Sequence, residues 1–167
     1  MFFLKPTLPT SGDRQVALVE FKKALEAHRE QDYSTALTHY RTSAEKDGSL
    51  YEAHYNLGAV ALRLRQLELA LTSLEKATTA RPSSSDAHYN FARALQMAGY
   101  PLDAVDSYER AIQLNPDNAN AHLALGGLHA GELNAPTTAR KHYNRFLELN
   151  PNHPKSSDVR YWIYRNQ

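Results

Sequence analysis

The sequence contains no cysteine, which excludes disulfide bridges, thiolate nucleophiles and sites whose metal is ligated by cysteine. It also lacks an excess of either charge, because 19 Lys and Arg residues are balanced by 18 Asp and Glu residues. Nucleic acids and anionic membranes attract proteins that carry clustered positive charge. We therefore expect no nucleic acid among the partners of this protein.

Long apolar runs are missing as well. Near the start of the sequence, only Phe2, Phe3 and Leu4 form an apolar run between Met1 and Lys5. A signal peptide needs roughly 7 to 15 apolar residues, and a membrane span needs about 20. The sequence thus predicts no direct membrane span. It leaves the compartment open: cytoplasmic by default, and periplasmic or membrane-tethered if an upstream signal or anchor has been removed.

The sequence does contain an internal repeat. Three segments of six residues align with one another at an interval of 34 residues: residues 53–58, 87–92 and 121–126. The same interval relates Ala70 to Ala104 and Pro82 to Pro116. A fixed period of this length is typical of helix–turn–helix units that stack to bury a shared core.

The repeated positions resemble the pattern of the tetratricopeptide repeat (TPR) family: a bulky residue, Leu-Gly, Ala, an aromatic residue, Ala and a closing Pro. The clearest copy places at these positions His88, Phe91-Ala92, Ala104, Tyr108, Ala111 and Pro116. The last copy is one residue longer, and Pro136 can open its second helix. The first copy is degenerate, with Gly48 in the place of the closing Pro. The resemblance covers residues 13–151.

This resemblance implies an all-α fold, a right-handed superhelical solenoid of about four helix–turn–helix repeats with a C-terminal capping helix. We expect an N-terminal extension or linker at residues 1–12 and a TPR domain at 13–151, with repeats at about 17–50, 51–84, 85–118 and 119–153. The capping helix is expected at residues 154–167, where Val159, Trp162 and Ile163 share one helical face. Ser85-Asp86 and Asp117-Asn118 are expected to cap helices.

Small residues at Gly58, Ala92 and Gly126 predict that the two helices of a repeat approach closely. Larger side chains from the second helices, such as Leu74 and Tyr108, are then expected to fill the space between the helices. The histidines that recur at 54, 88 and 122 occupy the bulky position of the repeat, so we interpret them as packing residues.

In TPR arrays the first helix of each repeat lines a concave groove, so the resemblance implies a protein–protein interaction module or scaffold. Its partner is expected to be a peptide or a helix of another protein. We expect the groove to be lined by Lys22, Tyr55, Asn56, Arg63, Tyr89, Asn90, Arg93, Met97 and Leu123. The fourth repeat offers Asn120, Ala124 and Gly127 at the same positions. Ala124 and Gly127 carry no polar side chain, so the row of polar groove residues ends there. The second and third repeats are therefore expected to grip the ligand.

The polar groove residues leave alternatives open. Asn56 and Asn90 each offer two donors and one acceptor to a ligand backbone, yet they can equally bond to neighbouring helices or water. Tyr55 and Tyr89 can anchor a ligand or belong to the core. Chaperone adaptors of this family grip a terminal carboxylate with a fixed set of Lys, Asn and Arg residues, and no register of this sequence reproduces that set.

A second function remains open: a structural subunit of a larger complex, or a self-associating one, that packs through its edges or convex face. Catalysis is not expected, because the sequence contains no nucleophile elbow, phosphate-binding Gly loop, dinucleotide fingerprint or His-Glu-x-x-His motif. No cofactor and no metal are expected either. Equivalent histidines on stacked helices lie about 8–10 Å apart, too far to share one ion.

Overall fold

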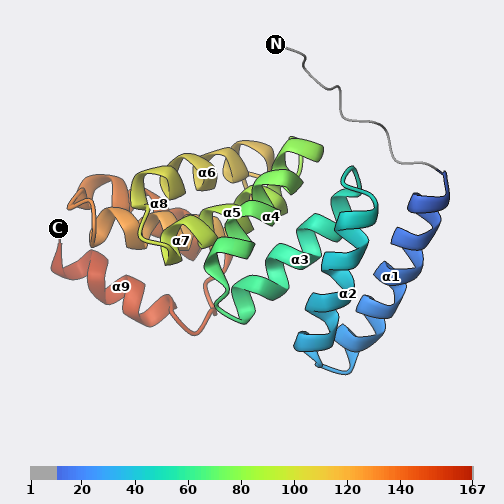
Figure 1. Ribbon diagram of the computed structural model, residues 1–167. Helices are drawn as coiled ribbons and strands as arrows, with labels where there is room; N and C mark the ends of the chain where they lie inside the picture. Colours follow the sequence, from blue (N-terminus) through green and yellow to red (C-terminus); the bar gives the residue numbers. More distant parts are fainter. Residues whose placement is uncertain (1–10, 167) are drawn as a thin grey trace, which may run out of the picture. The chain divides into compact units, whose positions relative to one another are not determined.

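The computed structural model describes residues 11–166, and all regular structure in this range is α-helical. The helices, shown in Figure 1, are α1 (Ser11–Arg29), α2 (Tyr33–Lys46), α3 (Tyr51–Arg63), α4 (Leu67–Ala80), α5 (Ser85–Met97), α6 (Pro101–Leu114), α7 (Ala119–Ala130), α8 (Pro136–Leu149) and α9 (Ser156–Arg165). The all-α class predicted from the repeat is confirmed. The expected N-terminal extension lies outside the described residues, apart from Ser11 and Gly12, which belong to α1.

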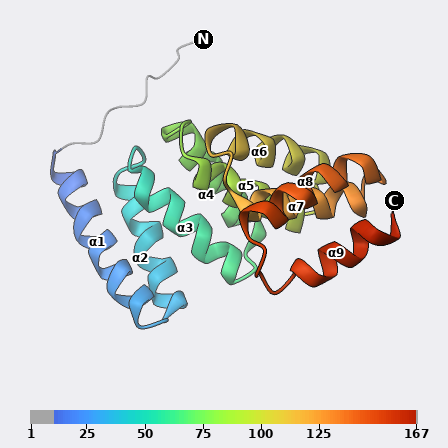
Figure 2. The same cartoon turned by 180° about the vertical axis from the view of Figure 1, so that it is seen from behind.

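The chain divides into two compact units, Met1–Pro82 with α1–α4 and Ser83–Gln167 with α5–α9. Within each unit, consecutive helices form antiparallel pairs, which can be followed from both sides in Figures 1 and 2. The pairs α1–α2 and α3–α4 make up the first unit, and α5–α6, α7–α8 and the single helix α9 make up the second. Across residues 11–166, every helix is too short or too polar to traverse a lipid bilayer.

Proline or a side-chain cap begins each of the helices α5 to α8. Pro101 and Pro136 are the first residues of α6 and α8, where the fixed φ of proline fits and its missing N–H costs nothing. Asn118 caps α7 as expected, since its Oδ1 accepts a hydrogen bond from the Ala121 N–H at 3.1 Å. These residues place the helix starts that the sequence predicts.

The cap of α5 differs from the prediction. Ser84, not Ser85-Asp86, precedes this helix, and its Oγ accepts a hydrogen bond from the Ala87 N–H at 3.2 Å. Ser85 lies within the first turn, and its hydroxyl donates instead to the Ala111 carbonyl at 3.0 Å. Three consecutive serines offer nearly equal caps, so the bond to α6 decides which of them enters the helix.

In the first unit, glycine sets the distance between paired helices. A Cβ added at Gly58 of α3 would lie 2.5 Å from Cγ of Leu74 on α4, so only a glycine permits the observed approach. In the α1–α2 pair, Tyr40 is fully buried and its ring lies 5.5 Å from that of Phe21. The close approach expected at the Leu-Gly position is thus confirmed in this unit.

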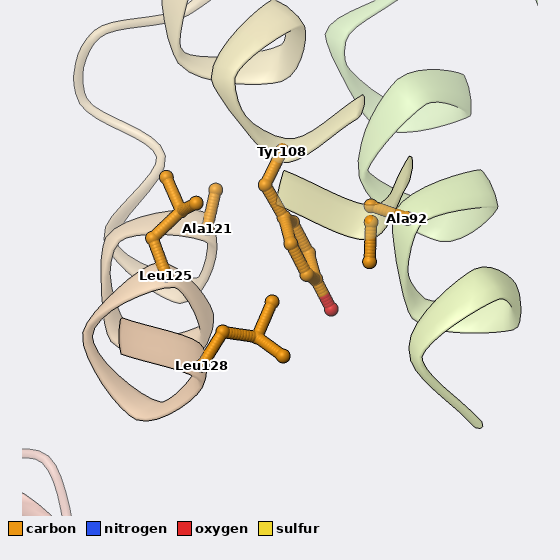
Figure 3. Packing of buried hydrophobic residues seen from close by; sticks show 6 residues of the cluster. Ala92, Tyr108, Ala121, Leu125 and Leu128 are labelled. Atoms are coloured by element: carbon orange, nitrogen blue, oxygen red, sulfur yellow. The ribbon is translucent and has the colours of Figure 1, made fainter. Parts of the chain in front are cut away.

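The core of the second unit is built around Tyr108 of α6. Figure 3 shows its ring between Ala92 of α5 and the side chains of Leu125 and Leu128 of α7. The ring is almost completely buried, and its hydroxyl donates a hydrogen bond to Gln96 Oε1 at 3.0 Å. One aromatic side chain therefore connects three helices of this unit.

Helix α9 covers the end of the last helical pair. Val159 is buried against a cluster formed by Ala139, Tyr143 and Phe146 of α8, and Trp162 and Ile163 pack against the same cluster. The Trp162 ring meets the Tyr143 ring edge-on, with 5.1 Å between their centroids. The apolar face predicted for this helix is the face that packs.

Removing Ser156 and all later residues is expected to destabilise the second unit by about 2 kcal/mol, because burial of one large apolar side chain contributes about 1.5–3 kcal/mol. Thermal unfolding followed by circular dichroism would measure the loss. Tyr161→Ala, a change on the 65 % exposed face of the same helix, is the control and should alter stability little. An unchanged Tm after the truncation would show that α9 does not protect the core.

Candidate functional site

The second unit contains a cavity of about 560 Å³, which we call the second-unit groove. Most of its lining residues come from α5, α7 and the start of α9. From α5 come Tyr89, Arg93, Gln96 and Met97; from α7 come Asn120, Leu123, Ala124 and Gly127; and from the start of α9 come Lys155, Asp158, Val159 and Trp162. Tyr108 of α6 and Tyr143 of α8 also line it.

Helical periodicity explains why these side chains share one surface. Tyr89, Arg93 and Met97 are spaced four residues apart, so they form a stripe along one face of α5. The lining residues between 120 and 127 on α7, and those between Lys155, the N-cap of α9, and Trp162, repeat the spacing of three and four residues. The second-unit groove is therefore bounded by three aligned stripes on rigid elements, and loops contribute little to it.

Tyrosines give the second-unit groove a partly aromatic surface with polar tips. The ring of Tyr89 lies 5.7 Å from that of Tyr108, in a tilted arrangement. Burial raises the pKa of Tyr89, Tyr108 and Tyr143, so all three hydroxyls stay protonated at neutral pH. Rings of this kind offer a ligand apolar area and a hydrogen-bonding group at little conformational cost.

Charged groups flank the apolar part. Arg93 is exposed, its guanidinium donates to Asn90 Oδ1 at 3.2 Å, and it lies 5.9 Å from the centre of the Tyr89 ring. Lys155 and Asp158 also line the second-unit groove. Two cations and one anion thus surround an apolar surface, which suits a ligand that combines an apolar side chain with an acidic group.

Comparison with known families agrees with the repeat. A model described as tetratricopeptide repeat matches residues 21–85, and a second one, described as TPR repeat, matches residues 103–131. The chain belongs to the tetratricopeptide repeat family. No curated protein matches the sequence.

Solved structures of TPR proteins share the fold. The crystal structure of MamA protein superposes with a TM-score of 0.84 at 20% identity, over 91% of this chain and 82% of that chain. YrrB, described as a TPR protein with an unusual peptide-binding site, gives a TM-score of 0.75 at 24% identity, over 90% of this chain and 75% of YrrB. The first TPR of Spaghetti (RPAP3), bound to the HSP90 peptide SRMEEVD, gives a TM-score of 0.68 at 22% identity, over 72% of this chain and 95% of that chain.

Four of the groove residues predicted from the TPR pattern line the second-unit groove: Tyr89, Arg93, Met97 and Leu123. Asn120, Ala124 and Gly127, expected at the same positions of the fourth repeat, line it too. Asn90 lies beside this surface, and its side chain is engaged by Arg93. Ala124 and Gly127, which the sequence predicts to end the row of polar groove residues, lie in this wall and bring no polar side chain to it.

The predicted residues of the first unit lie on α1 and α3. Lys22 is exposed on α1, and Tyr55 and Asn56 are half-buried on α3. The Arg63 guanidinium lies 4.2 Å from the centre of the Tyr33 ring, so it already makes a cation–π contact within the unit. A groove that runs through all four TPR repeats stays a prediction.

The TPR pattern did not reveal several lining residues. Tyr108 was expected only in the core, but in the structure it also lines the second-unit groove, and so does Tyr143. The contribution of α9 was missed because its apolar face was read only as a cap. The spacing of Lys155, Asp158 and Trp162 was a usable signal, since it puts them on one side of the helix.

Two of the recurring histidines, His54 and His122, are buried. Their burial agrees with their interpretation as packing residues. His54 and His122 are 3 % and 8 % exposed, and their Nε2 atoms bond to the Gly48 and Pro116 carbonyls at 3.0 and 3.2 Å. Within the described part of the chain, no group of three or more His, Cys, Asp or Glu side chains is arranged to hold a metal ion. The structure does bring His142 close to both His122 and His129, which the sequence analysis did not predict.

Proposed function

We propose that this TPR protein is an interaction module that binds a segment of a partner protein in the second-unit groove, without a catalytic step. The observation that carries the proposal is the single surface formed by α5, α7 and α9, with its volume of about 560 Å³. Cavities of roughly 300–1,000 Å³ accept ligands the size of a few side chains. The proposal therefore concerns a short peptide segment or one face of a helix.

The chemistry of the lining suggests what the segment contains. Met97, Leu123 and Trp162 offer an apolar seat for one large side chain of the ligand. Arg93 and Lys155 can bind a carboxylate by charge-assisted hydrogen bonds, which are about twice as strong as neutral ones. Since Trp, Tyr and Arg dominate the energetics of binding sites, we expect Trp162, Tyr89 and Arg93 to contribute most.

The structural neighbours support this class of function. The RPAP3 repeat was solved with a bound peptide, and YrrB is described as having an unusual peptide-binding site. Their identities of 22% and 24% support a shared fold only. The ligand of this chain is therefore inferred from the residues that line its own groove. The proposed seat uses α9 in addition to the TPR helices.

Peptides selected by the chain from a random displayed library should bind in the second-unit groove. Trp162 is the single tryptophan of the chain, so its emission reports directly on occupancy. Arg93→Ala combined with Leu123→Ala is expected to weaken peptide binding at least tenfold, equivalent to about 1.4 kcal/mol, by fluorescence titration.

The matched control combines Arg110→Ala with Leu102→Ala, the same changes on α6 at exposed positions that do not line the groove. It should leave affinity within about threefold. Equal weakening by both variants, or selected peptides that bind without any response of Trp162, would contradict the proposal.

One observation favours the second candidate function, assembly through an outer face. Val16, Leu18 and Val19 of α1 are 45–51 % exposed, which leaves apolar surface on the first helix. Affinity purification from the native source separates the two functions. Partners that survive the Arg93 and Leu123 changes but are lost with Val19→Glu would favour assembly over groove binding.

A further inference from the structure

Three histidines meet between α7 and α8. His122 and His129 lie seven residues apart on α7, and His142 of α8 lies near both. Nδ1 of His122 is 3.2 Å from Nδ1 of His142, and the rings of His129 and His142 are stacked with 5.9 Å between centroids. Both ring nitrogens of His129 are buried without a hydrogen-bond partner. We call these three residues the histidine cluster.

The hydrogen bonds of the cluster allow a charge on His122 or on His142, but not on both rings at once. Nε2 of His122 must carry a hydrogen, because the Pro116 carbonyl 3.2 Å away can only accept. Nδ1 of a neutral His122 is then an acceptor, so His142 Nδ1 donates to it. Protonation of both rings would leave two N–H groups facing each other across 3.2 Å, because each Nδ1 would then carry a hydrogen.

The charges around the cluster do not favour its protonation. Lys141 of α8 and the neighbouring rings act against a charge on His142. Asp117 and Glu148 act in favour of a charge on His122, but both already pair with Arg145, at 2.7 and 2.9 Å. Burial lowers the pKa of His122, and burial together with the charges of His122 and His129 lowers the pKa of His142 to about 4.

The same interface supports the second-unit groove. Leu123, Ala124 and Gly127 of α7 line the groove on one side, while His122 and His129 of this helix meet α8. Tyr143, which follows His142 on α8, lines the groove and abuts Gly126 of α7. Separation of α7 from α8 would therefore dismantle one wall of the groove.

We propose that the histidine cluster is a proton-operated switch, through which acidification loosens α7 from α8 and opens the second-unit groove so that it releases its ligand. The release of a ligand rests on the proposed function, whereas the opening of the helices does not. At His122 and His142 the folded unit binds protons more weakly than the unfolded chain, whose histidines titrate near pH 6.5. Stability is therefore complete above about pH 6.5 and is lost as the pH falls toward 4.

Thermal unfolding followed by Trp162 emission tests the switch without any ligand. Between pH 7.5 and 5.0, the Tm of the unmodified chain is expected to fall by roughly 5–10 °C. The double variant His122→Gln/His142→Gln, which keeps polar side chains and removes the titrating rings, should show less than half of this fall. Equal falls in both proteins would overturn the proposal.

His54→Gln is the matched control, because His54 is a buried histidine with the same kind of carbonyl bond but lies in the first unit. This variant should show the full fall of the Tm between pH 7.5 and 5.0, as measured by Trp162 emission. If the double variant does not fold, an NMR titration of His142 in the unmodified chain decides: a pKa well below 6 supports the switch, and a pKa near 6.5 overturns it.

Peptide titrations separate this proposal from the proposed function. A peptide selected at pH 7.5 should bind at least tenfold more weakly at pH 5.0 to the unmodified chain, and less than threefold more weakly to the double variant. Selected peptides that never bind the groove would refute the proposed function alone, since the ligand-free melting still decides the switch. Binding that is equally strong at both pH values would refute the switch alone.

Discussion

Replacing Tyr108 with Ala is expected to lower the free energy of unfolding of the second unit by about 3–5 kcal/mol, the range for removal of a buried aromatic ring. The ring is 1 % exposed and fills the space between Ala92 on one side and Leu125 and Leu128 on the other. Its neighbour Ala92 is too small to occupy the space that the ring leaves. Urea unfolding followed by Trp162 emission measures the loss.

Tyr108→Phe is the control for this prediction. It keeps the ring and removes only the hydrogen bond to Gln96, so a loss of about 0.5–1.5 kcal/mol is expected. The difference between the two variants isolates the contribution of ring packing. Similar losses for Ala and Phe would mean that the hydroxyl, not the packing of three helices around the ring, stabilises this unit.

Gly126→Leu is expected to destabilise the second unit by about 3 kcal/mol or more, and Gly126→Ala by about 1–3 kcal/mol. A Cβ at this position would lie 2.4 Å from Cδ1 and 2.5 Å from Cε1 of Tyr143. The Tyr143 ring is itself held against Trp162, so it cannot move aside without disturbing α9. Thermal unfolding followed by Trp162 emission detects the change.

The adjacent glycine provides the matched control. A Cβ at Gly127 would meet only the Tyr143 hydroxyl, at 3.9 Å, which is an ordinary contact. Gly127→Ala should therefore keep or raise stability, by up to about 1 kcal/mol, since alanine favours a helix. Equal destabilisation by Gly126→Ala and Gly127→Ala would show that the distance between α7 and α8 is not set by Gly126.

Much of the fold could be predicted because its causes are local in the chain. The interval of 34 residues indicated helix–turn–helix units, and Pro136 marked a helix start correctly. The cap of α5 was misplaced by one residue, since Ser84 and Ser85 have the same chemistry and only the bond from Ser85 to the Ala111 carbonyl distinguishes them.

The candidate site could be predicted only in part. The TPR pattern identifies the face of each first helix, and so it found Tyr89, Arg93, Met97 and Leu123. It could not show that Lys155 and Trp162 stand across from them, because the pattern describes repeats and α9 is not one. Nor could it show that the Arg63 guanidinium already makes a cation–π contact with the Tyr33 ring.

By itself, the sequence determined the repeat, the helical class and the positions where helices must approach closely, because periodicity, proline and glycine act through neighbouring residues along the chain. Only the tertiary structure decided that α9 completes the second-unit groove and that His122, His129 and His142 come together. Those contacts depend on how far apart two helices pack and how they are rotated. At α7 and α8 this distance is set by the ring of Tyr143 against Gly126.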